Sequence, residues 1–373
     1  MQKTGILGGG QLGRMLLQQA ANYPVETYIM ENDPECPAAH LCHHFVLGDI
    51  RNYEDVYNFG KGLDAITIEI ESVNVEALER LEAEGVKVYP QPSILRLIKN
   101  KILQKEFYKQ HDIPTAEYVV VQHKKELEQY SAFLPAVNKI AEGGYDGRGV
   151  VIIKNERDLE KGFDAPGILE KLISVQKEIS VIIAKSADGQ TAFYPPVEMV
   201  FDPRLNLLNY QVCPADVPEN TLWRIEAIAL KVAKALKSPG LFAVELLVDT
   251  NQAVYVNETA PRVHNSGHHT IEANACSQYD MLWRILLGYP LGNTAVIKPS
   301  ALVNLVGENN YNGEVQYLGL PETLAIDNTY VHLYGKKQTK PGRKMGHVTL
   351  TGDHTKDLIR KALLIKEQLR VIA

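Results

Sequence analysis

Cysteine is scarce in this chain. Its 373 residues include only Cys36, Cys42, Cys213 and Cys276, and no two of them form a CxxC pair. A disulfide framework and a structural zinc knuckle both need cysteines at suitable spacing. The sequence therefore argues against both kinds of site and indicates a reducing, cytoplasmic compartment.

Long apolar runs and one-sided charge are also missing. No stretch approaches the roughly 18 apolar residues of a membrane-spanning helix. The 39 basic and 45 acidic residues are interspersed, and neither sign accumulates in a tail. We therefore expect neither a membrane nor a nucleic-acid partner, whereas small polar ligands stay open.

The first hundred residues have the pattern of an open α/β sheet. An apolar strand from Lys3 to Leu7 enters the turn GGGQLG, an amphipathic helix follows, and VETYIME is the next expected strand. AITIEIE and VKVYP add strands to a mostly parallel sheet. Ser93 is then expected to cap one helix that carries LRLIKNKILQKEFYKQH.

After Thr115 the pattern changes to antiparallel hairpins joined by glycine turns, such as PAVNKIA and VVIIK around EGGYDGRG. A helix is expected from about Thr221 to Lys237, followed by the hairpin LFAVELLVDTNQAVYVNE. The last seventy or so residues contain the strands ALVNLVG, YVHLYG and GHVTLTG and a closing helix after His354. The chain is therefore predicted to combine α/β and α+β parts.

The glycine loop Gly8-x-Gly10-x-x-Gly13 matches the dinucleotide fingerprint, and Glu31 ends the next strand, where a ribose-binding carboxylate would sit. Glycines allow a backbone to approach an anion at a helix N-terminus. NAD, another phosphate and a plain strand-to-helix turn all satisfy this pattern. The loop alone does not decide among them.

Two acidic residues lie on the hairpin that follows the predicted helix. If Val248 pairs with Ala253, Glu245 lies opposite Val256 and Glu258 is one diagonal step away on the same face. Stems at that diagonal are about 7 to 8 Å apart, so the two carboxylates can share magnesium ions. Because Glu245 has apolar neighbours and an unpaired buried charge is costly, a metal is favoured over two solvated carboxylates.

The stretch VNETAPRVHNSGHH, residues 256–269, contains three histidines. Oxygen ligands with Asn257 beside them suit a hard cation. His264, His268 and His269 lack the H-x-x-x-H spacing and a cysteine partner. Zinc is therefore disfavoured, and these histidines are interpreted as hydrogen-bonding groups of a substrate loop or as structural residues.

Two further segments could bind anions. The hairpin tip GGYDGRG offers backbone N–H groups and Arg148 to phosphates, although an ordinary flexible hairpin has the same composition. The segment GKKQTKPGRKMGH is either a solvated turn or, as we favour, a second phosphate site. Its cations are Lys336, Lys337, Lys340, Arg343 and Lys344.

Together with NE-x-APR-x-HNSGH, YGK and PGRKMGH, these features resemble the N5-carboxyaminoimidazole ribonucleotide synthetase family (PurK) of ATP-grasp enzymes. The resemblance covers essentially the whole chain, and APRVHNSGHHTIEA and PGRKMGHV are its specific parts. It implies a three-domain ATP-grasp fold, usually a homodimer. The domains would be a doubly wound pre-ATP-grasp sheet at residues 1–100, an ATP-grasp region at 101–298 with a lid at about 116–173, and a β-rich domain at 299–373.

The activity that the resemblance implies is a carboxylation. Bicarbonate, activated by ATP as carboxyphosphate, would carboxylate the exocyclic amine of 5-aminoimidazole ribonucleotide in purine biosynthesis, releasing ADP and phosphate. Magnesium would bridge the phosphates, cations would neutralise developing charge, and a lid would exclude water.

The resemblance also assigns roles to individual residues. ATP would be bound by Lys101, Lys139, Gly144, Tyr145, Asp146, Gly147, Arg148, Gly149, Val150, Glu170, Lys171, Leu172, Ile173, Glu178, Asn257 and Glu258. Magnesium would be held by Glu245 and Glu258. The catalytic group would comprise Arg262, His264, Asn265 and Ser266 with Tyr145 and Asp146. The ribonucleotide would be held by Gln11, Leu12, Glu71, Tyr145, Arg148, Lys336, Arg343 and Lys344.

Three positions depart from the family pattern. Lys101 stands where an arginine is common, Asn138 where an apolar residue is usual, and Phe201 where a histidine often contacts the nucleotide. Other interpretations stay open. They are another ATP-grasp ligase, such as a formate-using transformylase or a biotin carboxylase, an NAD-dependent oxidoreductase, and a nucleotide-binding regulatory protein without turnover.

Overall fold

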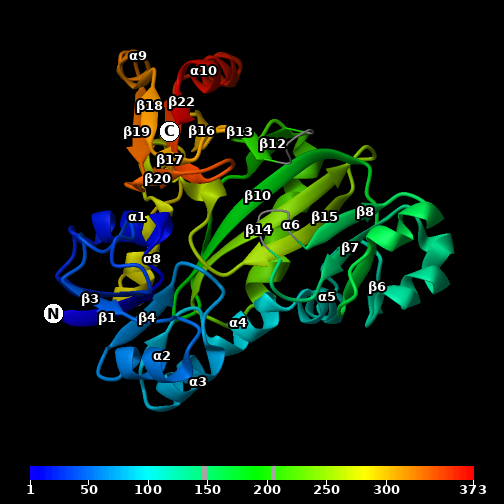
Figure 1. Cartoon of the computed structure of the whole chain (residues 1–373), viewed down its shortest axis with the longest axis horizontal. Helices are drawn as coiled ribbons and strands as arrows, with labels where there is room; N and C mark the ends of the chain where they lie inside the picture. Colours follow the sequence, from blue (N-terminus) through cyan, green and yellow to red (C-terminus); the bar gives the residue numbers. More distant parts are fainter. Residues whose placement is uncertain (145–148, 203–206) are drawn as a thin grey trace.

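The computed structural model describes residues 1–144, 149–202 and 207–373. An N-terminal sheet, a small lateral sheet, a long central sheet and a C-terminal group of strands follow one another along the chain (Figure 1). Within these described parts, no helix is long and apolar enough to cross a membrane.

The N-terminal sheet is parallel throughout, as the sequence predicts, with the strand order β3-β2-β1-β4-β5. Its elements are β1 (Gln2–Leu7), α1 (Gln11–Ala20), β2 (Val25–Glu31), β3 (His44–Leu47), α2 (Tyr53–Gly60), β4 (Ala65–Ile68), α3 (Val75–Ala83) and β5 (Lys87–Val88). Strand β3 is not expected from the sequence, because it is a short edge strand of four residues and none of them is buried.

The prediction of a single helix after Ser93 is wrong. The chain forms α4 (Pro92–Lys99) and α5 (Lys101–Gln110), separated by Asn100 in an extended conformation. The Asn100 side chain accepts hydrogen bonds from the first N–H groups of α5, which is the usual work of an N-cap. This break places Lys101 at the start of a helix instead of within one.

The lateral sheet is antiparallel, with the strand order β6-β9-β7-β8. Its elements are β6 (Tyr118–Val121), η1 (Lys124–Phe133), β7 (Ala136–Ile140), β8 (Val150–Ile153), η2 (Glu156–Lys161) and β9 (Gly167–Lys171). It has a small apolar core of its own, and it lies at the far end of the molecule from the C-terminal strands (Figure 1). A layer with its own core is suited to act as a lid.

The central sheet has the order β15-β14-β10-β12-β13-β16-β21-β19, with β11 beside β10, so the central and C-terminal strands form one hydrogen-bonded sheet. The strands are β10 (Val175–Lys185), β11 (Thr191–Phe193), β12 (Val197–Asp202), β13 (Leu207–Cys213), β14 (Gly240–Asp249), β15 (Val254–Ala260), β16 (Ser300–Val306), β19 (Thr329–Leu333) and β21 (Lys344–Thr351). The short elements are η3 (Asn265–Gly267), α7 (Thr270–Ala273), β17 (Gly313–Glu314), β18 (Gln316–Leu318), α9 (Leu320–Leu324), β20 (Gln338–Thr339) and β22 (Arg370–Ile372).

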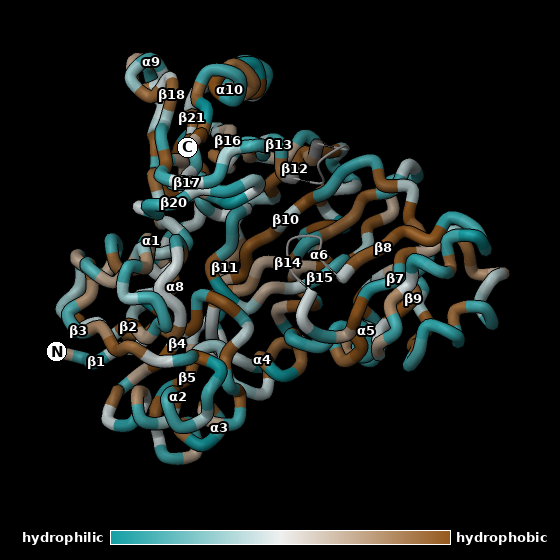
Figure 2. Tube along the Cα trace, viewed as in Figure 1, coloured by the Kyte–Doolittle hydropathy of each residue, from teal (hydrophilic) through white to brown (hydrophobic). Residues whose placement is uncertain are grey.

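Helices cover both faces of the central strands. One face packs against α6 (Glu219–Ala235) and the other against α8 (Gln278–Leu287), while α10 (Thr355–Gln368) covers the C-terminal strands. Figure 2 shows the resulting apolar band along β10. Fully buried Trp283 of α8 donates its indole N–H to Leu16 O of α1, at 2.7 Å. Truncating such a residue typically costs about 3 to 5 kcal/mol, so this contact fastens the N-terminal sheet to the central one.

Candidate active site

The register of the β14–β15 hairpin differs from the predicted one. Val248 pairs with Val254, not with Ala253. One extra residue, Asn257, bulges from β15, so the residues after it are shifted by one position relative to β14. The predicted diagonal arrangement of the two acidic residues is therefore wrong.

Glu245 and Glu258 lie directly opposite each other on neighbouring strands. Burial, followed by the charges of Glu258 and Glu178, raises the pKa of Glu245. Burial acts in the same direction on Glu258, but Lys101, whose Nζ lies 2.6 Å from Glu258 Oε2, outweighs it and lowers the pKa of Glu258. Two facing carboxylates that repel each other form a site that a divalent cation would stabilise.

Lys139 lies beside this pair. Its Nζ is 2.9 Å from Asn257 Oδ1 and 2.5 Å from Glu170 Oε2. Buried Lys105 of α5 pairs with the other oxygen of Glu170 and donates to Thr115 Oγ1. Burial raises the pKa of Glu170, but Lys139 and Lys105 outweigh it and lower that pKa. Sequence reasoning missed Lys105, although it lies one helical turn after Lys101.

The segment expected to bind the adenine edge, residues 170–173, is partly engaged within the lateral sheet. The Lys171 N–H donates to Glu117 O and the Leu172 N–H to Pro135 O. Its assignment therefore stays a prediction. Gly149 accepts a hydrogen bond from Ile140, and Val150 begins β8. Gly144 ends the described part of the tip, and the expected site residues Tyr145, Asp146, Gly147 and Arg148 lie outside the described residues.

The loop after β15 lies on the same side as the carboxylates. His264 Nε2 is 3.6 Å from Glu245 Oε1, and His264 Nδ1 is 2.9 Å from Ser266 Oγ. Ser266 Oγ in turn lies 2.7 Å from Ser180 Oγ on β10, and Ser180 pairs with Glu245 across the sheet. Asn265 Oδ1 is buried and has no hydrogen-bond partner among the described residues. Such an atom is usually satisfied by a ligand or by water.

His268 and His269 are buried and hold this loop in place through hydrogen bonds. His269 Nδ1 lies 3.0 Å from Ser266 O, and Tyr279 Oη lies 2.8 Å from His268 Nδ1. Burial lowers the pKa of His269 to about 4, and it also lowers the pKa of His268 well below its ordinary value. In the described part of the chain, no group of three or more His, Cys, Asp or Glu residues is arranged to hold a metal. Magnesium would therefore need phosphate oxygens and water besides the two carboxylates.

The N–H groups of the glycine loop are already occupied. Gly10 and Gly13 each donate to a different oxygen of Glu69, both at 2.6 Å, and Gly9 donates to Glu31 Oε2 at 3.0 Å. A dinucleotide pyrophosphate would need these same groups. The geometry therefore argues against the NAD interpretation, including the ribose-binding role considered for Glu31.

The cationic C-terminal segment lies beside α1. Lys336 Nζ donates to Lys344 O at 2.8 Å, and Arg343 Nη1 donates to Gln338 O at 2.8 Å. A Cβ built on Gly335 would lie 3.1 Å from Arg14 Nη1, so the YGK turn contacts α1. Lys336 also lines a hollow of about 550 Å³ formed by Glu314, Val315, Tyr317, Leu333, Gly335, Lys336, Lys337 and Gln338.

Comparisons with known proteins cover the chain in three successive parts. Family models match the ribonucleotide synthetase preATP-grasp domain at residues 1–99, the ATP-grasp domain at 106–279 and the phosphoribosylaminoimidazole carboxylase C-terminal domain at 300–361. The N5-carboxyaminoimidazole ribonucleotide synthase of Staphylococcus aureus (strain COL) is 31% identical over 357 residues, which are 94% of this chain and 92% of that protein. The chain belongs to the N5-carboxyaminoimidazole ribonucleotide synthase family.

Solved structures of this family confirm the predicted ATP-grasp fold with its N-terminal parallel sheet. The Thermotoga maritima synthetase superimposes with a TM-score of 0.93 at 36% identity, covering 100% of both chains. The Aspergillus clavatus synthase in complex with ADP and 5-aminoimidazole ribonucleotide has a TM-score of 0.89 at 31% identity, covering 98% of each chain.

Some curated relatives are longer proteins. The chloroplastic phosphoribosylaminoimidazole carboxylase of Vigna aconitifolia is 34% identical over 94% of this chain but matches over only 64% of its own length. The bifunctional purine synthesis protein purC/E of Dictyostelium discoideum is 36% identical over 92% of the chain and matches over 36% of its length. The chain therefore spans less than two thirds of these first relatives.

Two of the departures from the family pattern have clear structural settings. Lys101 forms an ion pair with Glu258. An arginine at this position would supply the same positive charge. Asn138 is buried within the lateral sheet, where it donates to Ile168 O at 3.1 Å and accepts from Phe163 N at 2.9 Å. Asn138 thus holds β7 and β9 together. Phe201 lies on β12.

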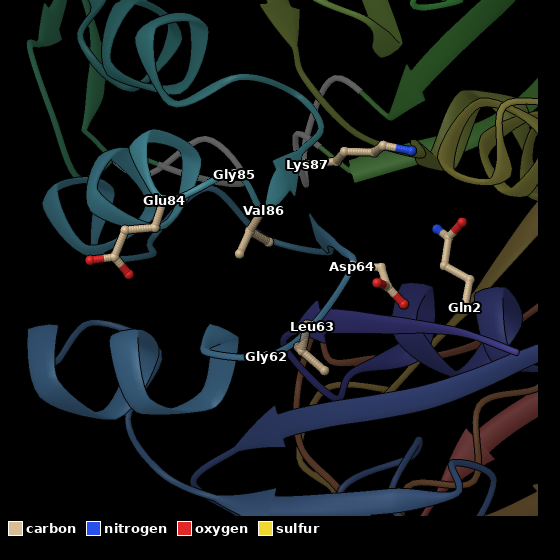
Figure 3. A pocket seen from close by; sticks show the side chains of 8 residues that line it. All are labelled: Gln2, Gly62, Leu63, Asp64, Glu84, Gly85, Val86 and Lys87. Atoms are coloured by element: carbon tan, nitrogen blue, oxygen red, sulfur yellow. The ribbon is translucent and has the colours of Figure 1, made fainter.

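Figure 3 shows a second hollow, of about 540 Å³. It is lined by Gln2, Gly62, Leu63, Asp64, Glu84, Gly85, Val86 and Lys87, none of which belongs to the candidate site. It lies at the amino-terminal ends of β1, β4 and β5, whereas open parallel sheets bind ligands at the carboxyl ends. We assign it no function.

Proposed function

We propose that this family member carboxylates the exocyclic amine of 5-aminoimidazole ribonucleotide with bicarbonate, at the expense of ATP, giving N5-carboxyaminoimidazole ribonucleotide, ADP and phosphate. The observation that carries the proposal is the position of the Glu245–Glu258 pair. Lys101 contacts Glu258, Lys139 contacts the adjacent Asn257, and His264 lies close to Glu245. The lysines expected to bind phosphate and the loop expected to bind bicarbonate are therefore close to the same pair of carboxylates.

Lys101 and Lys139 would neutralise the triphosphate. Lys101 contacts a Glu258 oxygen and Lys139 contacts the Asn257 amide oxygen. Each lysine would exchange that contact for a phosphate oxygen when ATP binds. Glu245, Glu258 and the Asn257 amide have the oxygen donors that magnesium prefers. Bound magnesium would supply charge neutralisation to the β- and γ-phosphates. The raised pKa of Glu245 supports this fit, since a nearby cation would stabilise its charged form.

The loop of Arg262, His264, Asn265 and Ser266 would hold bicarbonate beside the γ-phosphate. Transfer of the γ-phosphoryl group to a bicarbonate oxygen would give carboxyphosphate and ADP. The ribonucleotide amine would then bond to the carboxyl carbon while phosphate leaves, and the amine's proton would be released. Orienting both partners and excluding water are what the loop and the lid would contribute.

The ribonucleotide would lie between the N-terminal and C-terminal parts. Arg262 Nε is 3.0 Å from Glu71 Oε1, which brings the bicarbonate loop to the N-terminal sheet. The phosphate would bind near Gln11 and Leu12, with Lys336, Arg343 and Lys344 opposite. We further propose domain limits at residues 100 and 298, a homodimer and a cytoplasmic location, in line with the family resemblance and the low cysteine content.

ADP release with Mg-ATP tests this function. Release should require both 5-aminoimidazole ribonucleotide and bicarbonate, and labelled bicarbonate should enter the ribonucleotide in a one-to-one ratio with ADP. Equal turnover with formate, or carboxylation of a biotinyl acceptor, would indicate another ATP-grasp ligase instead. ATP binding without any turnover would support the regulatory alternative.

A further inference from the structure

Glu69 supplies an anion to the start of α1 from a different strand. It directly follows β4, which pairs with β1, so its side chain reaches the turn between β1 and α1. Its two oxygens accept hydrogen bonds from Gly10 N and Gly13 N, both at 2.6 Å. Helix α1 has neither a side-chain cap nor an acidic residue in its first turn. Glu69 therefore satisfies backbone donors that a capping residue would otherwise take.

The glycines of this loop are explained by the same carboxylate. A Cβ on Gly8 would lie 2.4 Å from Glu69 Cγ, and one on Gly10 would lie 2.5 Å from Glu69 Oε1. Gly8 also has a φ of +104°, which side chains rarely adopt. The fingerprint pattern thus accommodates a protein carboxylate in place of a phosphate.

The position of Glu69 links two parts of the proposed ribonucleotide site. Gln11 and Leu12 lie between the two glycines that it binds, so their backbone is held on both sides. Two residues further along, Glu71 pairs with Arg262 of the bicarbonate loop. We propose that Glu69 is a positioning residue that sets Gln11 and Leu12 for the ribonucleotide phosphate. The identity of that ligand rests on the proposed function, whereas the anchoring of the loop does not.

Amide resonances test the anchoring without any substrate. Glu69→Gln keeps the side-chain volume, but its amide nitrogen cannot accept a hydrogen bond. The amide proton of Gly10 or Gly13 should therefore shift upfield in spectra of glycine-labelled protein, while the thermal unfolding temperature shows that the variant is folded. Unchanged resonances for both glycines would overturn the anchoring.

Steady-state kinetics test the positioning role. Glu69→Gln should raise the KM for the ribonucleotide about tenfold while the KM for ATP and kcat stay within about twofold. Glu69→Ala should show the same defect, and added acetate should reduce it. The control is Glu84→Gln, since Glu84 pairs with Arg80 at the surface of the same sheet domain.

The possible failures can be told apart. Equal increases in both KM values, or a loss of kcat with an unchanged ribonucleotide KM, would contradict a positioning role. If the wild-type chain shows no ribonucleotide-dependent turnover, the proposed function fails, and the glycine resonances still decide whether Glu69 anchors the loop.

Discussion

Lys101 Nζ lies 2.6 Å from Glu258 Oε2, so a lysine assigned to nucleotide phosphate neutralises a carboxylate assigned to magnesium. Lys139 and Asn257 have a similar relationship at 2.9 Å. Both lysines proposed to bind the nucleotide phosphates are thereby held by oxygen atoms of the proposed metal site. Binding of magnesium to the carboxylate would free the lysines for phosphate, and binding of the triphosphate to the lysines would free the carboxylate for magnesium. The two ligands should therefore favour each other's binding.

Glu258→Gln should abolish turnover without unfolding the protein. An amide is a weaker ligand than a carboxylate, and even outer partners of metal ligands are worth about 10- to 100-fold, so we expect a loss of activity above about 100-fold. Loss of the Lys101 ion pair should lower the unfolding temperature somewhat, and loss of repulsion toward Glu245 should offset part of that decrease. ADP release over a magnesium titration is the measurement. Wild-type activity at limiting magnesium would remove the metal assignment.

Lys101→Met should strengthen binding of the bare metal and weaken binding of ATP. Removal of the ammonium group leaves Glu258 without its cation, so Mn²⁺ should bind severalfold more tightly in the absence of nucleotide. The KM for Mg-ATP should rise about tenfold, because a charged contact to phosphate is lost. Paramagnetic titration measures the first effect. Lys99→Met is the control, since Lys99 binds Val73 O, and equal Mn²⁺ affinity in all three proteins would contradict the exchange.

Lys105→Met should destabilise the fold. Removing one partner of a buried ion pair typically costs about 3 to 5 kcal/mol. Glu170 keeps Lys139, and burial outweighs the attraction of Glu170 and lowers the pKa of Lys105, so we expect the low end, about 3 kcal/mol. The lowered pKa of Glu170 stabilises the wild type above the ordinary carboxyl value of 4.5, and this contribution is lost as the pH falls through the folded-state pKa. The variant should lose stability less steeply on acidification.

Urea unfolding at neutral and acidic pH measures this effect. The double variant Lys105→Met with Glu170→Gln should lose further stability, because it also leaves Lys139 without the Glu170 carboxylate. A loss below about 1 kcal/mol in the single variant would mean that the buried cluster contributes no more than a surface pair.

Lys344→Ala should mainly raise the KM for the ribonucleotide, by about tenfold, with little effect on the KM for ATP. The reason is that the Lys344 segment is held by Lys336 beside α1, where the ribonucleotide phosphate is proposed to bind. Lys337→Ala is the matched control, because exposed Lys337 pairs with Glu35. An effect confined to ATP would mean that the wrong phosphate has been placed there.

Periodicity along the chain was sufficient for most elements of the fold. The parallel order of the N-terminal sheet follows from its alternation of strands and helices, and α6 spans Glu219–Ala235 where a helix was expected from about Thr221 to Lys237. The break at Asn100 was missed because asparagine is an acceptable residue within a helical pattern. Only its extended backbone and its capping bonds reveal two helices.

The residue types of the candidate site could also be predicted from the sequence, since short motifs contain them. The contacts that these residues make could not be predicted. Lys105 beside Glu170 and Ser180 beside Ser266 belong to segments far apart in the chain. The acidic pair itself was placed two residues out of register, because the local pattern indicates neither the Val248–Val254 pairing nor the bulge at Asn257.

By itself, the sequence determined which segments form strands and helices and which short motifs carry chemistry, because both depend on neighbours within a few residues. Tertiary structure alone decided that Glu69 fills the glycine loop and that Lys101 meets Glu258 across 157 residues. Those contacts depend on how separate elements pack, and packing responds to shape and charge brought together from the whole chain.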